Sequence, residues 1–140
     1  MSGRVRLSRT IPALPVRQVE AAVDFYVQRM GFAALHVASG FAVIKRDDAE
    51  LHLWECDDER WTSRGGGASP VISGAESFLA GTASCRIEVD AVDALYDELR
   101  VAQVLHQVSD DGVATTDFGT REFATGDLDG NLVSFFTWVS

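Results

Sequence analysis

The chain has 140 residues, 46% of them apolar and 24% charged, and this balance excludes a disordered or fibrous chain. A chain of this length predicts one domain over residues 1–140. The 21 acidic and 12 basic residues give a formal net charge of −9, which disfavours a nucleic-acid partner because phosphate backbones are repelled. This acidity either keeps the protein soluble or attracts a cationic ligand.

No apolar run reaches the roughly 18 residues that cross a bilayer. The start of the chain, MSGRVRLSRT, carries positive charge with no apolar stretch behind it, so we expect no membrane partner and a cytoplasmic location. The two cysteines, Cys56 and Cys85, are far apart and form no CxxC pair, which indicates neither a zinc site nor a disulfide framework. We interpret both as buried or incidental thiols.

A repeated pattern organises the chain, first from Ile11 to Val27 and again from Ser84 to Arg100. Each copy opens with a short apolar run typical of a strand and then changes to a period near 3.6, which indicates an amphipathic helix. Gly31 is suited to end the first helix. The residues predicted to form the buried face of that helix are Val19, Ala22, Val23, Tyr26 and Met30.

Two strands are predicted after the first helix, from Phe41 to Lys45 and from Glu50 to Glu55, on either side of a turn at Asp47-Asp48. A further strand is expected near Leu35. Residues 9–56 are therefore predicted to form a first β-α-β-β-β module.

Residues 57–81 connect the two copies and are rich in glycine and serine. A segment of this length inside a small domain is usually either functional or flexible. Trp61 and Phe78 give it apolar side chains to bury. It is either a simple connector, or a flap over a pocket or a dimer contact.

Residues 82–140 are predicted to form the second module. Asp90 is placed to cap the second helix, and Asp93 adds negative charge where the helix dipole favours it, so we interpret both as helix-stabilising residues and not as catalysts. A strand is expected near Leu105. The buried helix face is predicted at Val92, Leu95, Tyr96 and Leu99, and two strands, from Arg121 to Thr125 and from Asn131 to Trp138, flank a turn at Asp127 to Gly130.

Two such modules side by side predict an α+β fold. We expect a curved, mostly antiparallel sheet of eight strands, with both helices on its convex face. The concave face is then left free for a ligand.

The alternation of strand residues between the two faces predicts which side chains line that concave face. Leu51, Leu53, Val133 and Phe135 suit the helix side. The candidate ligand-binding residues on the other side are Glu50, His52, Trp54, Ser84, Arg86, Glu88, Ser134, Phe136 and Trp138, with Ile11 and Ala13 added from the first strand. Such a mixture of aromatic, polar and acidic groups suits an amphipathic organic molecule. The three aromatic side chains either stack on a planar or cationic ligand or fill core space.

The chain also resembles a known family in three segments and in its internal duplication. The segments are VRQVEAAVDFYVQRMGF, VDAVDALYDEL and FGTREFATGDLDGNLVSFF. They resemble the glyoxalase/bleomycin-resistance/dioxygenase, or vicinal oxygen chelate, superfamily over nearly the whole chain. The G-x-R-E-F and D-x-D-G-N patterns are closest to its bleomycin-resistance branch.

The metal-dependent enzymes of that superfamily hold a divalent ion with His, Glu and sometimes Gln from four positions on the concave face. By resemblance these positions fall on Ile11, Ser84 and Ser134, and on either Glu50 or His52. One strong donor does not make the three- or four-ligand site that a catalytic metal needs. We therefore expect no metal and no cofactor, and we interpret His52 as a hydrogen-bonding group of the pocket.

The resemblance implies a homodimer that sequesters a cationic antibiotic. We therefore expect metal-independent binding of an amphipathic, cationic small molecule such as a bleomycin-type antibiotic, with no catalytic residue. One alternative is a superfamily enzyme, lyase or dioxygenase-like, with an atypical or absent metal site, in which Glu50, His52 and Glu88 supply the acid–base groups. The other is a structural or regulatory module whose aromatic side chains are closed off.

Overall fold

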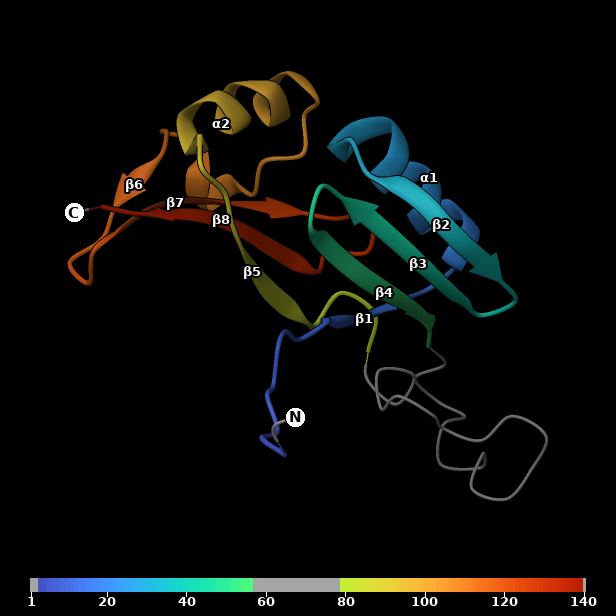
Figure 1. The fold of residues 1–140 in the computed structure, drawn as a ribbon. Helices are drawn as coiled ribbons and strands as arrows, with labels where there is room; N and C mark the ends of the chain where they lie inside the picture. Colours follow the sequence, from blue (N-terminus) through green and yellow to red (C-terminus); the bar gives the residue numbers. More distant parts are fainter. Residues whose placement is uncertain (1–2, 57–78, 140) are drawn as a thin grey trace.

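The computed structural model describes residues 3–56 and 79–139. The first module contains β1 (Ala13–Val16), α1 (Val19–Met30), β2 (Ala33–Ala38), β3 (Phe41–Arg46) and β4 (Ala49–Glu55). The second module contains β5 (Ser84–Glu88), α2 (Val92–Val101), a 3-10 helix (Gln107–Ser109), β6 (Ala114–Thr115), β7 (Thr120–Gly126) and β8 (Leu132–Trp138). This order confirms the predicted α+β class and the tandem β-α-β-β-β arrangement (Figure 1).

The two modules build their sheets with the same topology. The strand orders are β1-β4-β3-β2 and β5-β8-β7-β6, and each sheet has one parallel pair, β1 with β4 and β5 with β8. The other pairs are antiparallel, as expected. The expected single sheet of eight strands is not confirmed: β1 and β5 are edge strands of two separate four-stranded sheets.

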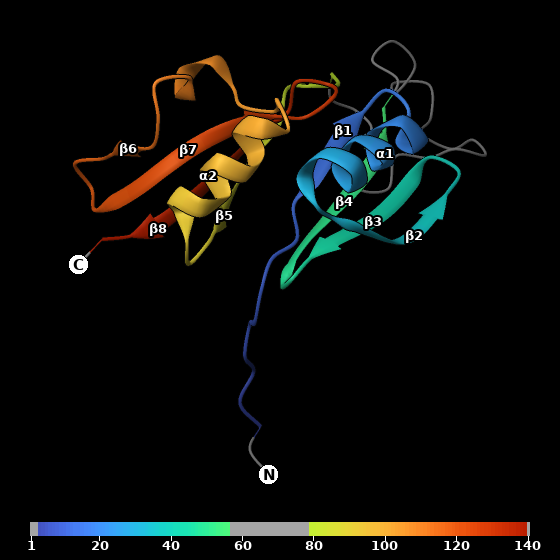
Figure 2. The same cartoon turned by 90° about the horizontal axis from the view of Figure 1, so that it is seen from above.

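Each helix covers one face of the sheet of its own module (Figures 1 and 2). The five residues predicted for the inner face of α1 are all buried, and Gly31 ends that helix with a left-handed φ of 76°. In the strands beneath the helices Leu51, Leu53, Val133 and Phe135 are buried as predicted. The opposite face of each sheet is therefore the one that the helices leave open.

The start of α2 differs from its prediction. The helix begins one residue later than a cap at Asp90 requires, its N-cap is Ala91, and no side chain caps it. Asp93 lies in the first turn of α2, as predicted, and also forms an ion pair of 2.6 Å with Arg121. The prediction of Asp90 as a cap was therefore wrong.

The predicted strand near Leu105 is also wrong, because Leu105 makes only an isolated bridge to Thr125. The chain continues into the short 3-10 helix, where the backbone N–H of its second residue, Val108, donates to Nδ1 of His106. The side chain of Ser109 then accepts a hydrogen bond of 2.8 Å from the backbone of Ala124. The strand expected there comes later in the chain, as β6.

Hydrogen bonds join the modules in several places within the described residues. The loop from Asp127 to Asn131, between β7 and β8, reaches into the first module, where Asn131 Nδ2 donates to the carbonyl of Pro15 at 2.9 Å. On another side Arg46, at the end of β3, forms two hydrogen bonds with Glu98 of α2. A single cluster of buried apolar side chains spans both modules.

Candidate functional site

Aromatic side chains cover part of the open face of the first module. Phe41 and Trp54 are cross-strand partners on β3 and β4, and their ring centroids lie 4.4 Å apart. His52 meets the Phe41 ring edge-on at 5.3 Å. Both His52 and Trp54 are half-buried, because the alternating Leu51 and Leu53 turn towards α1. The result is a partly accessible ring surface on the open face of the first sheet.

Charged groups lie beside these rings. Glu50 Oε2 is 2.8 Å from Nε2 of His52, and its Oε1 is 3.4 Å from the guanidinium of Arg9. The hydrogen bond from His52 is the main reason why the pKa of Glu50 is lowered. Glu50 is therefore a carboxylate near neutral pH, next to an aromatic surface. This combination favours an organic cation.

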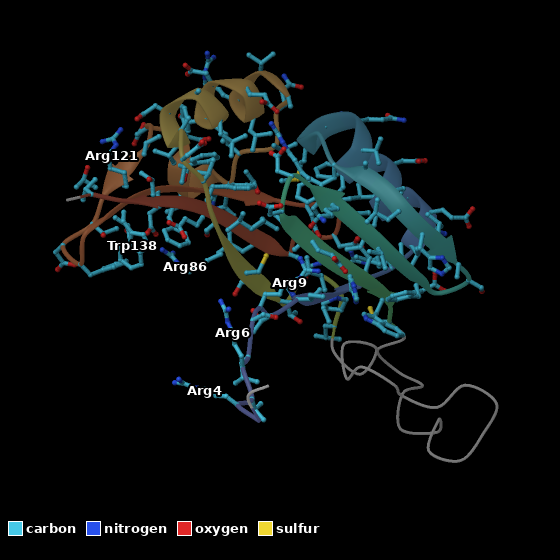
Figure 3. All side chains as sticks on the ribbon, in the orientation of Figure 1. Arg4, Arg6, Arg9, Arg86, Arg121 and Trp138 are labelled. Atoms are coloured by element: carbon cyan, nitrogen blue, oxygen red, sulfur yellow. The ribbon has the colours of Figure 1, made fainter. Side chains whose placement is uncertain are left out.

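The open face of the second module has a different arrangement. Arg86 forms two parallel hydrogen bonds with Glu122, of 3.0 and 2.8 Å, and its guanidinium lies 4.8 Å from the ring centroid of Phe136. Trp138 meets Phe136 edge-on at 5.6 Å. Figure 3 shows Arg86 and Trp138 on the side of the sheet that faces away from α2.

Two members of these groups, Phe41 and Glu122, were missed by the sequence analysis. Phe41 is the cross-strand partner of Trp54, and Glu122 is the partner of Phe136. The predicted residues on these strand pairs lie on β4 and β8. Applied to β3 and β7 as well, the alternation rule would have placed both side chains on the open face.

The remaining predicted residues differ from one another in how far they are exposed to solvent. Ser84 and Glu88 are exposed on β5, whereas Ser134 is buried in β8. Ile11 and Ala13 are exposed at the start of the first sheet. Among the residues that the structure describes, no hydrogen bond, ion pair or ring contact joins the group of the first module to that of the second. The predicted residues thus form two groups, one on the open face of each sheet.

A hollow of about 920 Å³ lies between the modules. Its walls include the β3–β4 turn, the end of β5 and the first turn of α2, and Glu88 is the one predicted site residue among them. Acidic side chains from both modules, including Asp47 and Asp90, border an apolar floor that includes Phe32 and Phe135. The hollow lacks the tryptophan rings of the two open faces.

The donor set does not fit a divalent metal at the superfamily's usual place. Of the four positions, Ile11 has no donor atom, and Ser84 and Ser134 offer only hydroxyl groups. Glu50 and His52 are bonded to one another. Across residues 3–56 and 79–139, no group of three or more His, Cys, Asp or Glu side chains is placed to hold a metal ion.

Comparison with known proteins shows to which family the chain belongs. Residues 7–135 match the family model of the Glyoxalase/Bleomycin resistance protein/Dioxygenase superfamily. The chain belongs to this superfamily. Within it, the bleomycin resistance proteins of Geobacillus stearothermophilus and Staphylococcus aureus are each 44% identical to the chain over 131 residues, which cover 94% of this chain and 97% of each relative.

Solved structures of the superfamily agree with the fold. The bleomycin-binding protein of Streptomyces verticillus, in complex with copper(II)-bleomycin, is similar with a TM-score of 0.70 and 28% identity, over 94% of this chain and 97% of that one. The bleomycin resistance determinant encoded on transposon Tn5 has a TM-score of 0.66 and 20% identity, over 94% and 98% of the two chains. The second likeness supports the fold alone.

None of the helices in the described part of the chain has the length and apolar character needed to cross a membrane.

Proposed function

We propose that this protein binds and sequesters an amphipathic organic cation, such as a bleomycin-type antibiotic, without a metal of its own and without changing the ligand. The binding surface is formed by the open faces of the two sheets. Its residues are Glu50, His52, Trp54, Ser84, Arg86, Glu88, Ser134, Phe136 and Trp138, with Phe41 and Glu122 added from the structure.

One observation carries this proposal: the paired rings of Phe41 and Trp54 lie partly open beside the Glu50 carboxylate. An aromatic face attracts a cation through its quadrupole, and a nearby carboxylate adds to the attraction. The overall charge of −9 acts in the same direction at longer range. The names of the relatives, which are bleomycin resistance and bleomycin-binding proteins, support the choice of ligand.

The proposal includes a homodimer. Trp138 is 61% exposed at the end of β8, and the two ring groups are separate and open within one chain. A second copy placed over these faces would shield the aromatic surface from water and enclose a ligand between the chains. Sedimentation at micromolar concentration should therefore give twice the mass of the chain, whereas a monomer would contradict this part of the proposal.

Calorimetric titration with bleomycin, both metal-free and loaded with copper, tests the function. We expect saturable binding with a Kd of about 1 μM or lower. We also expect mass spectrometry to recover the ligand unchanged. An absence of heat would remove the antibiotic as ligand. A ligand of altered mass would instead favour the alternative of a superfamily enzyme.

A further inference from the structure

The two open faces carry different residues at equivalent strand positions. In the first sheet Ala13 of β1 is the register partner of His52 on β4, and in the second sheet Arg86 of β5 takes the corresponding place beside Ser134 on β8. The first module therefore has the methyl group of Ala13 at the position where the second module has the guanidinium of Arg86.

The next cross-strand pair shows the same contrast. In the first sheet Phe41 and Trp54 are partners and leave two rings together, whereas in the second sheet the partner of Phe136 is Glu122. The repeated fold thus places an acidic group and a basic group around the ring of the second module.

Arg86 is held firmly in this position. Both Nη atoms bond to the two oxygens of Glu122, and Glu122 also accepts a hydrogen bond of 2.6 Å from the hydroxyl of Thr120. Thr120 is fully buried, so it anchors the carboxylate to the sheet. A two-pronged contact of this kind fixes the plane of a guanidinium as well as its position.

The chain's own cation therefore already occupies the ring face of Phe136. The guanidinium lies 4.8 Å from the Phe136 centroid and 6.0 Å from that of Phe118. The charge of Arg86 repels a ligand cation, whereas a planar guanidinium also stacks on uncharged rings.

We propose that Arg86 is a specificity-determining residue that directs the ligand: an uncharged planar ring stacks over Arg86 and Phe136, and the cationic end is received by Trp54 and Glu50. This inference rests on the proposed function. Each open face then accepts a different chemical part of an amphipathic cation.

Two small probes that differ mainly in charge can test this assignment. Quinoline is uncharged at pH 7.5, and N-methylquinolinium has nearly the same ring with a permanent positive charge. The readout is the indole N–H resonance of each tryptophan in a ¹H–¹⁵N spectrum, assigned with Trp→Phe variants. In the wild-type protein quinoline should shift the Trp138 signal, and N-methylquinolinium should shift the Trp54 signal and leave Trp138 unmoved.

Arg86→Ala should change this pattern. It exposes the Phe136 ring and leaves the Glu122 carboxylate unpaired beside it, so N-methylquinolinium should now shift Trp138. The Trp138 shift should saturate with N-methylquinolinium in this variant and stay absent in the wild-type protein over the same concentration range. Arg86→Lys keeps the positive charge and should still exclude the cation.

Arg121→Ala is the matched control. It removes the same charge from the same sheet, but Figure 3 shows Arg121 on the side of α2, where it pairs with Asp93. The wild-type pattern should persist in this variant. Circular dichroism and thermal unfolding confirm that each variant is folded before the probes are added.

The results separate this inference from the proposed function. If N-methylquinolinium shifts Trp138 equally in the wild-type protein and in Arg86→Ala, the role of Arg86 is wrong even where bleomycin binds. If bleomycin does not bind the wild-type protein, the antibiotic is removed as the ligand of the proposed function, and the probes still decide whether Arg86 excludes a cation from this face.

Discussion

The phenolic oxygen of Tyr26 in α1 lies 2.9 Å from Oδ2 of Asp127, in the loop between β7 and β8. This buried hydrogen bond joins the two modules. The same carboxylate accepts bonds from the side chain and backbone of Asn131 and from the backbone of Asp129. Burial raises the pKa of Asp127 above its ordinary value, and the pKa of the Tyr26 hydroxyl is raised mainly by burial and also by Asp127. The D-x-D-G-N pattern therefore connects the modules.

Tyr26→Phe should lower the free energy of unfolding by about 1–2 kcal/mol, because it leaves one oxygen of Asp127 with one donor fewer inside the protein. Tyr96→Phe is the matched control. Its hydroxyl donates to the carbonyl of Ser109 within the second module and remains partly accessible to water, so its loss should cost less. Urea denaturation measures both. An equal effect of the two substitutions would contradict a special role for the bond between the modules.

The sequence alone predicted the turn at Asp127 to Gly130 but not this role. Turn residues are recognised from local chemistry, whereas the bond to Tyr26 joins residues 101 positions apart. The buried face of α1 was predicted in full because its 3.6-residue period is a local signal. The strands and the two modules were likewise predicted from alternation and turn residues, and the resemblance to the superfamily agreed with them.

Gly81 provides a second test of the same loop. Its φ of 84° lies in the left-handed region, and a Cβ atom at this position would overlap the backbone oxygen of Asp129. Gly81→Ala should therefore destabilise the protein by more than the roughly 1–3 kcal/mol of backbone strain alone. Gly112 also has a positive φ, of 122°, but open space around it, so Gly112→Ala should show the strain without the overlap. Equal thermal shifts for the two variants would argue against this close approach.

Acidification should weaken the protein through its carboxylate–guanidinium pairs. Hydrogen bonds from Arg46 and Arg86 hold the pKa values of Glu98 and Glu122 below 4.5. The stability that these two pairs contribute is therefore complete above that pH, and it is lost as the pH falls through the folded-state pKa values. Each partly exposed pair contributes at most about 1 kcal/mol. Asp127 affects the pH dependence of stability in the opposite direction. Its pKa is raised in the folded protein, so protonation at low pH removes the cost of burying its charge.

The acid dependence is best measured by comparing Glu122→Gln with the wild-type protein. The glutamine variant has no charge to lose at this position, so its free energy of unfolding should fall less steeply between about pH 5 and pH 3. Parallel curves for the two proteins would show that Glu122 contributes nothing to the acid response.

Cys85 should be slow to react with thiol reagents. It is half-buried, and desolvation together with the negative charge of Asp127 raises its pKa to about 11. The thiolate that reacts is therefore scarce near neutral pH. The test is the rate at which Cys85 reacts with an uncharged disulfide reagent at pH 7.5. A rate equal to that of a free thiol in solution would contradict this prediction.

The candidate site was predicted in part. The alternation of Leu51, His52 and Leu53 between faces is a local rule, and the burial of the two leucines confirms it. The pairing of Arg86 with Glu122 was not found, because it depends on the register between β5, β8 and β7. The ligand-binding role of these residues and the cytoplasmic location stay predictions, and residues 57–78, including Trp61 and Phe78, lie outside the described part of the chain.

The central claim is that the open sheet faces bind the ligand and the hollow between the modules does not. The most direct test compares the bleomycin affinity of Trp54→Ala with that of Ala94→Gln, which changes the wall of the hollow. We expect Trp54→Ala to weaken binding about tenfold or more, since a central tryptophan often dominates an interface, and Ala94→Gln to leave it unchanged. Unchanged affinity in Trp54→Ala together with a loss in Ala94→Gln would place the ligand in the hollow and contradict this account.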